Sequence, residues 1–411
     1  MEKSFNIIFE DLERFDHRFY FQGNKDTLKV KHDRLNHILN NMGVTNIKLC
    51  NLSDSLVTPE ENFFYIIHQV QNYGFISEDF SLDDNLFDAV NNQKNVFVIF
   101  LNEREIIEDY FFEPAVEKFK EMGIDGRKYY FLNNNGLMDL YKEILDFEVG
   151  THSIRYLPLD MSSNLQKYPA ENVVDKKFFF MCHNRRMKPH RYAILSMLKK
   201  YKMLDDTDWS IIEGENYRTY HLRGDMVDID PRKEIFTEMD IAFLSDEIKY
   251  FSQFEVKKSF FEDFYERQDI DWITIHPESY LNSYINVVTE SNFETNDIHI
   301  TEKAFKPFYF YQIPIIIGNY RYLQFFKERY DFDLFEDLIN LDYDLEPNHR
   351  KRFFMVFDEV NKLYKNKEKI VKFYKENQDR FISNYQKAID IANDKYDYDF
   401  FQSIINLKIN G

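Results

Sequence analysis

The sequence predicts an α/β protein with two lobes, each built on a mostly parallel sheet. At 411 residues the chain exceeds the roughly 250 to 300 residues at which a single core stops growing. Short apolar runs alternate with helical patterns on both sides of a polar stretch, as expected of βα units. With 44% hydrophobic and 30% charged residues, the chain can form a core in each lobe and is unlike a disordered protein.

The first lobe is predicted to cover residues 1–165. Residues 59–74 and 113–123 begin with or next to proline and end in glycine, the asymmetry expected of helix starts and stops. We therefore expect a helix in each. The predicted strands are residues 5–9, 45–52, 95–101, 128–132 and 153–159.

The second lobe is predicted to cover residues 178–385, after a polar linker at 166–177 and before a helical tail at 386–411. Its apolar runs are residues 178–182, 209–214, 272–279, 283–291 and 313–318; its helices are 189–201, one that starts at Thr301, and a helical region from about 350 to 405. Two Rossmann-like lobes place a ligand cleft between them, at the carboxyl ends of the strands. Functional residues are therefore expected just after strands.

Composition and charge exclude several classes of protein. The net charge of −19 repels polyanions and disfavours DNA as a partner. No apolar stretch reaches the ~20 residues of a membrane span, and the start of the chain is too acidic for a signal peptide, so we expect a cytoplasmic protein of the producing or host cell. Cys50 and Cys182 cannot form a disulfide framework, and we expect both to be buried thiols. No Asp-x-Asp pair follows a strand, so no metal site is expected.

The stretch HITEKAFKPFYFYQIPIIIG, residues 299–318, is the first candidate site. Thr301 can cap a helix, whose N-terminal amides and dipole attract anions, and Lys303 adds a full positive charge there. This combination predicts a diphosphate cradle. Glu302, in the same turn, either stabilises the helix end or accepts hydrogen bonds from a sugar or ribose hydroxyl. Pro307 predicts a kink or an early restart of the helix.

Two further segments carry candidate residues. MCHNRRMKPHRY, residues 181–192, follows a strand and precedes a helix, so Arg186 and Arg191 could meet a second phosphate oxygen; the alternative is a solvated basic loop. Glu290 ends a strand about a dozen residues before Glu302. Its carboxylate either holds ribose or sugar hydroxyls or caps the following turn, and the sequence leaves both roles open.

The block YINVVTESNFETNDIHITEKAFKPFYFYQIPIIIG, residues 284–318, resembles the donor-binding block of the α-1,3-fucosyltransferase family. Its Thr-Glu-Lys-x-Phe-Lys-Pro variant looks more like glycosyltransferase-like proteins encoded by phages. The resemblance covers residues 177–320 and implies a two-lobed GT-B fold that binds a guanosine diphosphate sugar in the C-terminal lobe. By matching position, Lys303 resembles the diphosphate-binding lysine, Glu302 the sugar-contacting glutamate and Glu290 the glutamate of the Phe-Glu-Asn-Ser turn. Asn184 falls in the match to the family's Ser-Asn turn, and Arg191 resembles its phosphate-binding arginine.

The function implied is transfer of a sugar, GDP-fucose being one donor, to a hydroxyl of a carbohydrate or other acceptor, with inversion and without a metal or other cofactor. The general base must come from the other lobe, and the candidates are Glu148, Asp146 and Glu10, with Glu148 preferred. Two alternatives stay open. One is a phage glycosyltransferase of hydroxymethylated DNA bases, if residues 184–191 and 349–352 line one groove; the other is a noncatalytic protein that binds sugar nucleotides or polysaccharides.

Overall fold

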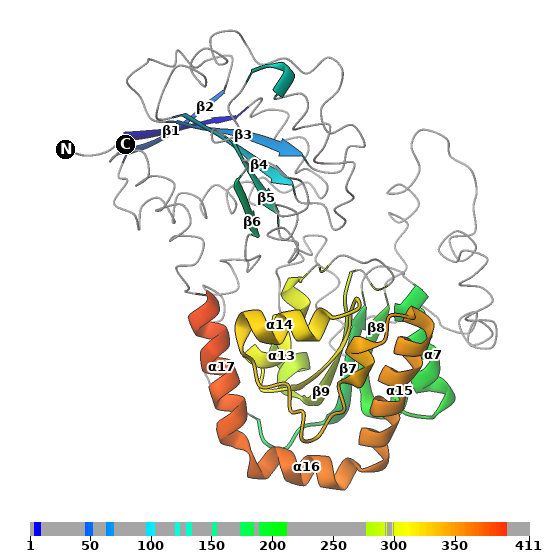
Figure 1. The fold of residues 1–411 in the computed structure, drawn as a ribbon. Helices are drawn as coiled ribbons and strands as arrows, with labels where there is room; N and C mark the ends of the chain where they lie inside the picture. The colour runs from blue at the N-terminus through cyan, green and yellow to red at the C-terminus, as the bar shows by residue number, and fades with distance from the viewer. Residues whose placement is uncertain are drawn as a thin grey trace. The chain divides into compact units, whose positions relative to one another are not determined.

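The computed structural model describes residues 4–9, 46–51, 63–69, 96–102, 120–123, 129–133, 150–153, 173–184, 189–211, 277–291, 293, 298 and 300–392. The chain divides into two compact units (Figure 1). The first comprises Met1–Asp160, Asp297–His299 and Asn393–Gly411, and the second comprises Met161–Asn296 and Ile300–Ala392.

The first unit is built on a six-stranded sheet in the order β2-β1-β3-β4-β5-β6, in which every pairing is parallel. The parallel sheet confirms the predicted class. β1, β2, β4 and β5 lie where the apolar runs predict them, whereas β6 precedes the predicted run at 153–159. The strands are β1 (Ser4–Phe9), β2 (Asn46–Asn51), β3 (Phe63–Gln69), β4 (Val96–Asn102), β5 (Tyr129–Asn133) and β6 (Gly150–Ser153).

The helix predicted at residues 59–74 is wrong, because residues 63–69 form β3, which pairs with β1 and β4. The segment FFYIIHQ is rich in aromatic and β-branched residues, which favour strands. Inner strands of parallel sheets lose the alternating pattern that would distinguish them from a helix. The second predicted helix fits better: residues 120 and 121 are helical. Gly123, at φ 70°, donates its N–H to the Lys120 carbonyl at 2.9 Å.

The second unit contains a four-stranded parallel sheet in the order β10-β9-β7-β8. Its strands are β7 (Phe178–Asn184), β8 (Thr207–Ile211), β9 (Ser283–Thr289) and β10 (Ile313–Ile317). β9 lies between β10 and β7, and all seven of its residues are buried. The two separate parallel sheets match the predicted two-lobe α/β architecture.

Helices flank this second sheet (Figure 1). They are α7 (Pro189–Lys200), α12 (Pro277–Leu281), α13 (Glu302–Tyr309), α14 (Tyr322–Tyr330), α15 (His349–Lys365), α16 (Lys367–Glu376) and α17 (Gln378–Ala392). α17 is continuous across residues 385 and 386, where the sequence places the start of a separate tail. Within the part of the chain described, no helix is both long and apolar enough to cross a membrane.

An aromatic cluster anchors α13 to α14. The rings of Phe308 and Phe332 stack with centroids 4.0 Å apart, and Phe305 meets Tyr330 edge-on at 5.0 Å. Phe326 stacks against both Phe308 and Phe332, at 5.8 and 5.4 Å. Such pairs contribute about 0.5–1.5 kcal/mol each beyond the area they bury. The cluster therefore fixes the direction of α13 and with it the position of its N-terminus.

α13 runs through Pro307 and ends at Tyr309. The Pro307 carbonyl accepts N–H groups from Phe310 at 3.3 Å and from Gln312 at 2.8 Å. The proline therefore marks the last turn of a short helix, and the chain passes from there into β10.

Candidate functional site

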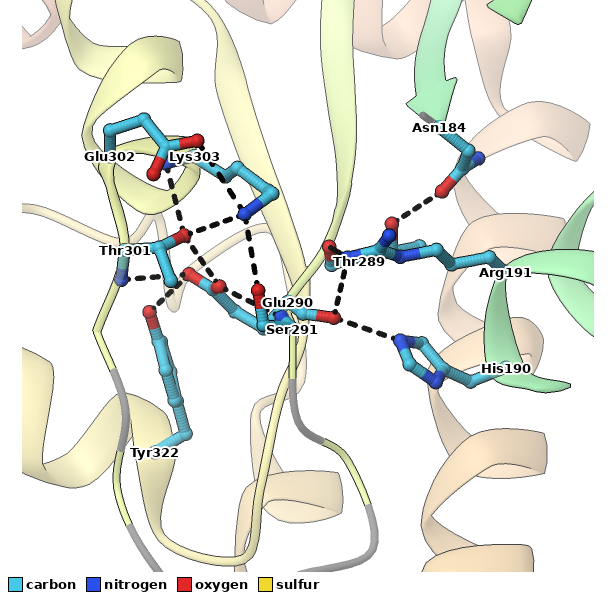
Figure 2. A network of polar contacts seen from close by, with 10 residues as sticks. All are labelled: Asn184, His190, Arg191, Thr289, Glu290, Ser291, Thr301, Glu302, Lys303 and Tyr322. Atoms are coloured by element: carbon cyan, nitrogen blue, oxygen red, sulfur yellow. Dashed lines mark hydrogen bonds and ion pairs between the residues drawn. The ribbon is translucent and has the colours of Figure 1, made fainter. Parts of the chain in front are cut away.

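Polar side chains gather where β7 and β9 end and where α7 and α13 begin (Figure 2). Asn184 is the last residue of β7 and Thr289 the last of β9. The Thr289 hydroxyl donates to Asn184 Oδ1 at 2.5 Å, which joins the two strand ends. These polar side chains therefore lie at the carboxyl edge of the second sheet.

The Glu290 carboxylate is fully buried and takes four hydrogen bonds. Oε1 accepts from the Tyr322 hydroxyl at 2.6 Å and the Thr301 N–H at 3.4 Å. Oε2 accepts from the Thr301 hydroxyl at 2.7 Å and the Ser291 N–H at 3.2 Å. A carboxylate offers about four lone-pair sites, so these donors occupy it. Of the two roles left open by the sequence, the geometry favours bracing the turn over binding a ribose.

Thr301 caps α13, as its sequence position predicts. Its backbone is extended, with φ −110° and ψ 172°, and its hydroxyl oxygen accepts the Lys303 N–H at 3.3 Å. The Lys303 ammonium also donates to the Thr301 hydroxyl oxygen, at 3.1 Å, and to Ser291 Oγ, at 3.4 Å. The Lys303 side chain is 30% exposed, so its charge lies at the surface of this edge.

The Glu302 carboxylate lies beside this ammonium, with Oε1 3.5 Å from Lys303 Nζ. Burial alone would raise the pKa of Glu302, but the ammonium groups of Lys303 and Lys306 outweigh it and hold the pKa below its ordinary value. Burial in turn lowers the pKa of Lys306, against the opposing effect of Glu302 and Glu290. Glu302 is therefore ionised at neutral pH and can accept hydrogen bonds.

The turn that follows β9, at residues 289–291, is contacted by His190 and Arg191 on the side opposite to Lys303 (Figure 2). His190 Nε2 donates to the Glu290 carbonyl at 2.9 Å. Arg191 Nη2 donates to the same carbonyl at 3.2 Å and to that of Thr289 at 3.4 Å. Both side chains are buried. Arg191 and Lys303 therefore contact one turn, and the arginine fixes its backbone.

The remaining predicted site residues lie outside the described residues. These are Arg186 and the three candidate bases, Glu148, Asp146 and Glu10.

Tyr322 and Ser291 also contact this cluster although the sequence predicts no role for them, and His190 comes from the basic segment 181–192. Tyr322 comes from α14, 32 residues beyond the carboxylate it contacts. One local signal does exist: a Cβ at Gly318 would lie 2.7 Å from Tyr322 Cγ, so the glycine that closes the IPIIIG run makes room for this ring.

Metal ligands, cysteine and the second basic run give no further candidate site among the described residues. Among the described residues, no group of three or more His, Cys, Asp or Glu is placed to hold a metal ion. Burial raises the pKa of the Cys182 thiol to about 12, which makes it a poor nucleophile. In the basic run 349–352, buried Arg352 donates to the Glu346 carbonyl at 2.7 Å, and Lys351 pairs with the Glu346 carboxylate at 2.5 Å.

No protein-family model matches the sequence, and no curated protein does. Solved structures with some similarity include a UDP-forming α,α-trehalose-phosphate synthase from Burkholderia xenovorans, at 11% identity and a TM-score of 0.43, covering 87% of this chain and 76% of that one. T4 phage BGT in complex with UDP and Mn²⁺ shares 8% identity at a TM-score of 0.38, over 98% of this chain and 99% of that one. The DNA-modifying enzyme β-glucosyltransferase, studied with and without uridine diphosphoglucose, shares 9% at 0.39 over the same fractions. These similarities are too weak to decide an activity.

Proposed function

We propose that the chain is a glycosyltransferase that binds a nucleotide-diphosphate sugar at the carboxyl edge of its second sheet and transfers the sugar to a hydroxyl. One observation carries the proposal. The partly exposed Lys303 ammonium is held at the N-terminus of α13 and lies 3.5 Å from the carboxylate of Glu302. A cation at a helix start binds phosphate, and a carboxylate beside it binds hydroxyls, which are the two parts of a sugar diphosphate.

The proposed reaction needs negative charge to be stabilised as the diphosphate leaves. Lys303 and the positive end of α13 face the developing charge and require no reorganisation, because Thr301 and Glu290 already fix them. The resemblance to fucosyltransferases assigns Arg191 a phosphate contact as well. Its bonds to the carbonyls of Thr289 and Glu290 support a role in holding the turn.

The finer parts of the proposal rest on the sequence and on the resemblance. They are a guanosine diphosphate donor such as GDP-fucose, inversion at the sugar, a reaction without metal, contacts from Asn184 and Arg186, and Glu148 as the base ahead of Asp146 and Glu10. A DNA acceptor is disfavoured by the net charge of −19 and by the internal contacts of Arg352 and Lys351.

A thermal-shift screen against GDP, UDP, ADP and dTDP sugars tests donor binding. A donor that binds only the folded chain stabilises it by about 2.7 kcal/mol at a hundredfold excess over its Kd. CMP sugars, which carry one phosphate, are the matched control and should shift Tm less than the best diphosphate donor. If no diphosphate sugar raises Tm, the proposed function is wrong.

Turnover separates an enzyme from a binding protein. With the identified donor and a set of carbohydrate acceptors, we expect nucleoside diphosphate release that depends on the acceptor. Glu148→Gln should abolish this release and leave donor affinity nearly unchanged, because a base acts only when the acceptor proton leaves. Donor binding without release by the unaltered chain would instead favour the noncatalytic alternative. A steep salt dependence of DNA binding would favour the DNA alternative.

A further inference from the structure

We infer that Tyr322 and Glu290 are positioning residues, which hold the Lys303 ammonium in place for the donor diphosphate through Thr301 and do not touch the donor themselves. The inference rests on the proposed function and deepens it. It assigns a role to Tyr322, which lies in α14 outside every segment singled out by the sequence, and it gives Glu290 the bracing role of the two that the sequence left open.

The direction of each hydrogen bond is fixed by the groups involved. A carboxylate only accepts, so the single hydroxyl protons of Tyr322 and Thr301 both point to Glu290, over 2.6 and 2.7 Å. The two lone pairs of the Thr301 oxygen then face the Lys303 N–H at 3.3 Å and the Lys303 ammonium at 3.1 Å. Thr301 therefore has no hydroxyl proton to donate to a phosphate. Its oxygen can only accept hydrogen bonds, which favours a cation such as the Lys303 ammonium beside it.

Tyr322 supplies the fixed end of this chain of contacts. Its side chain is fully buried, and its ring lies nearly parallel to that of Phe326, at 11° and 6.3 Å. Burial and the adjacent Glu290 carboxylate raise the pKa of Tyr322, so the hydroxyl stays protonated at neutral pH. The Gly318 backbone also approaches the ring closely, because a Cβ there would lie 2.7 Å from Tyr322 Cγ.

Loss of the Tyr322 hydroxyl has a defined consequence. Glu290 Oε1 would keep only the Thr301 N–H at 3.4 Å, which leaves a buried carboxylate oxygen poorly satisfied. The carboxylate then gains by turning toward other donors, and the Thr301 hydroxyl and the Lys303 ammonium move with it. The main effect should therefore fall on phosphate binding through Lys303.

The test is calorimetric titration of the full chain with the nucleotide-diphosphate sugar that stabilises it most. We expect Tyr322→Phe to weaken donor binding about three- to tenfold. In a double-mutant cycle, the same substitution in a Lys303→Ala background should have almost no further effect, because its route to the donor is gone. Tyr374→Phe is the matched control: Tyr374 is also fully buried, and its hydroxyl donates to the Tyr311 carbonyl at 2.8 Å. This control should lower stability without changing donor affinity.

Thr301 provides a second measurement that does not depend on the folding of Tyr322→Phe. Thr301→Val keeps the shape and removes the hydroxyl, and should weaken donor binding as Tyr322→Phe does. Thr301→Ser keeps the oxygen and should restore affinity to within about twofold of the unaltered chain.

Three outcomes would overturn the inference. They are unchanged donor affinity in Tyr322→Phe, an equal loss with and without Lys303, and equal affinities of Thr301→Ser and Thr301→Val. If the unaltered chain binds no nucleotide sugar, the proposed function fails first and the positioning role falls with it. If that chain binds a donor and these variants bind it equally well, only the positioning role is wrong.

Discussion

Lys303→Ala is the substitution that most directly tests the proposed donor site. Its cost to folding should be small because the side chain is 30% exposed and its polar contacts are long, at 3.1 Å to Thr301 Oγ1, 3.4 Å to Ser291 Oγ and 3.5 Å to Glu302 Oε1. Contacts of a partly exposed lysine contribute about 0–1 kcal/mol, and the Lys306 ammonium still acts on the buried Glu302 carboxylate when Lys303 is removed. We therefore expect a free energy of unfolding within about 1 kcal/mol of that of the unaltered chain.

The effect on donor binding should be larger. A charge-assisted hydrogen bond to a phosphate contributes about 1.5–3 kcal/mol. Since about 1.4 kcal/mol corresponds to a factor of ten in Kd, the variant should bind the donor roughly 10- to 150-fold more weakly. The effect should shrink for a CMP sugar, which has one phosphate fewer to contact.

Calorimetric titration measures this change, with Lys362→Ala as control. Lys362 lies on α15 and pairs with Glu359 at 2.7 Å, so the control also removes a half-exposed, ion-paired lysine. Donor affinity of the control should equal that of the unaltered chain. An affinity of Lys303→Ala within twofold of the unaltered chain would refute the assignment of the diphosphate to this edge of the sheet.

Two further predictions concern stability. Gly318→Ala places a Cβ 2.7 Å from Tyr322 Cγ, so it should lower the free energy of unfolding by about 1–3 kcal/mol in urea titrations; an unchanged midpoint would contradict the packing described. Lys176, which is buried and donates to the Leu281 carbonyl at 2.7 Å, has its pKa lowered to about 7 by burial. The unfolded chain holds this proton up to its ordinary pKa of 10.5. The free energy of unfolding should therefore rise with pH between 7 and 10.5, by up to about 1.4 kcal/mol per pH unit. As pH falls, this contribution of Lys176 declines and is lost by the folded-state pKa of about 7. Lys176→Met should flatten this slope in urea titrations at pH 7, 8 and 9, and equal slopes would contradict it.

The parallel sheets were predictable because their strands are short apolar runs bounded by polar residues. β7, β9 and β10 follow this pattern closely. β3 was not predicted, because the segment FFYIIHQ fits a buried helix as well as an inner strand. Only its pairing with β1 and β4 decides between the two.

α14 shows a second limit. Its N-cap position is Arg321, at φ 62°, which offers no side-chain cap. The cap comes from Asp344, whose carboxylate accepts the N–H groups of Leu323 at 2.8 Å and Gln324 at 2.9 Å. A helix start fixed by a residue about 20 positions away leaves no local signal of the kind that Thr301 gives for α13.

The sequence predicts polar residues just after strands, and Asn184 and Thr289 do end β7 and β9, but the roles of the residues there could not all be predicted. Thr301 followed from a local capping pattern. For Glu290 the sequence could not decide between ligand and brace, because the answer depends on how many donors surround its carboxylate. One of these donors, Tyr322, is brought there by tertiary packing. Side-chain type indicates what a residue can do, and its hydrogen-bond partners decide what it does.

The position of β9 also bears on how quickly the turn can move. β9 is paired on both sides, by β10 and β7, and the Glu290 N–H that follows it donates to the Ile317 carbonyl at 3.0 Å. In amide hydrogen exchange, strands of this kind open at free energies close to that of global unfolding. We therefore expect the turn after β9 to be attached to a slowly exchanging strand. A ligand reaching Lys303 meets a preformed surface, and its association should follow a single kinetic phase without a preceding conformational step.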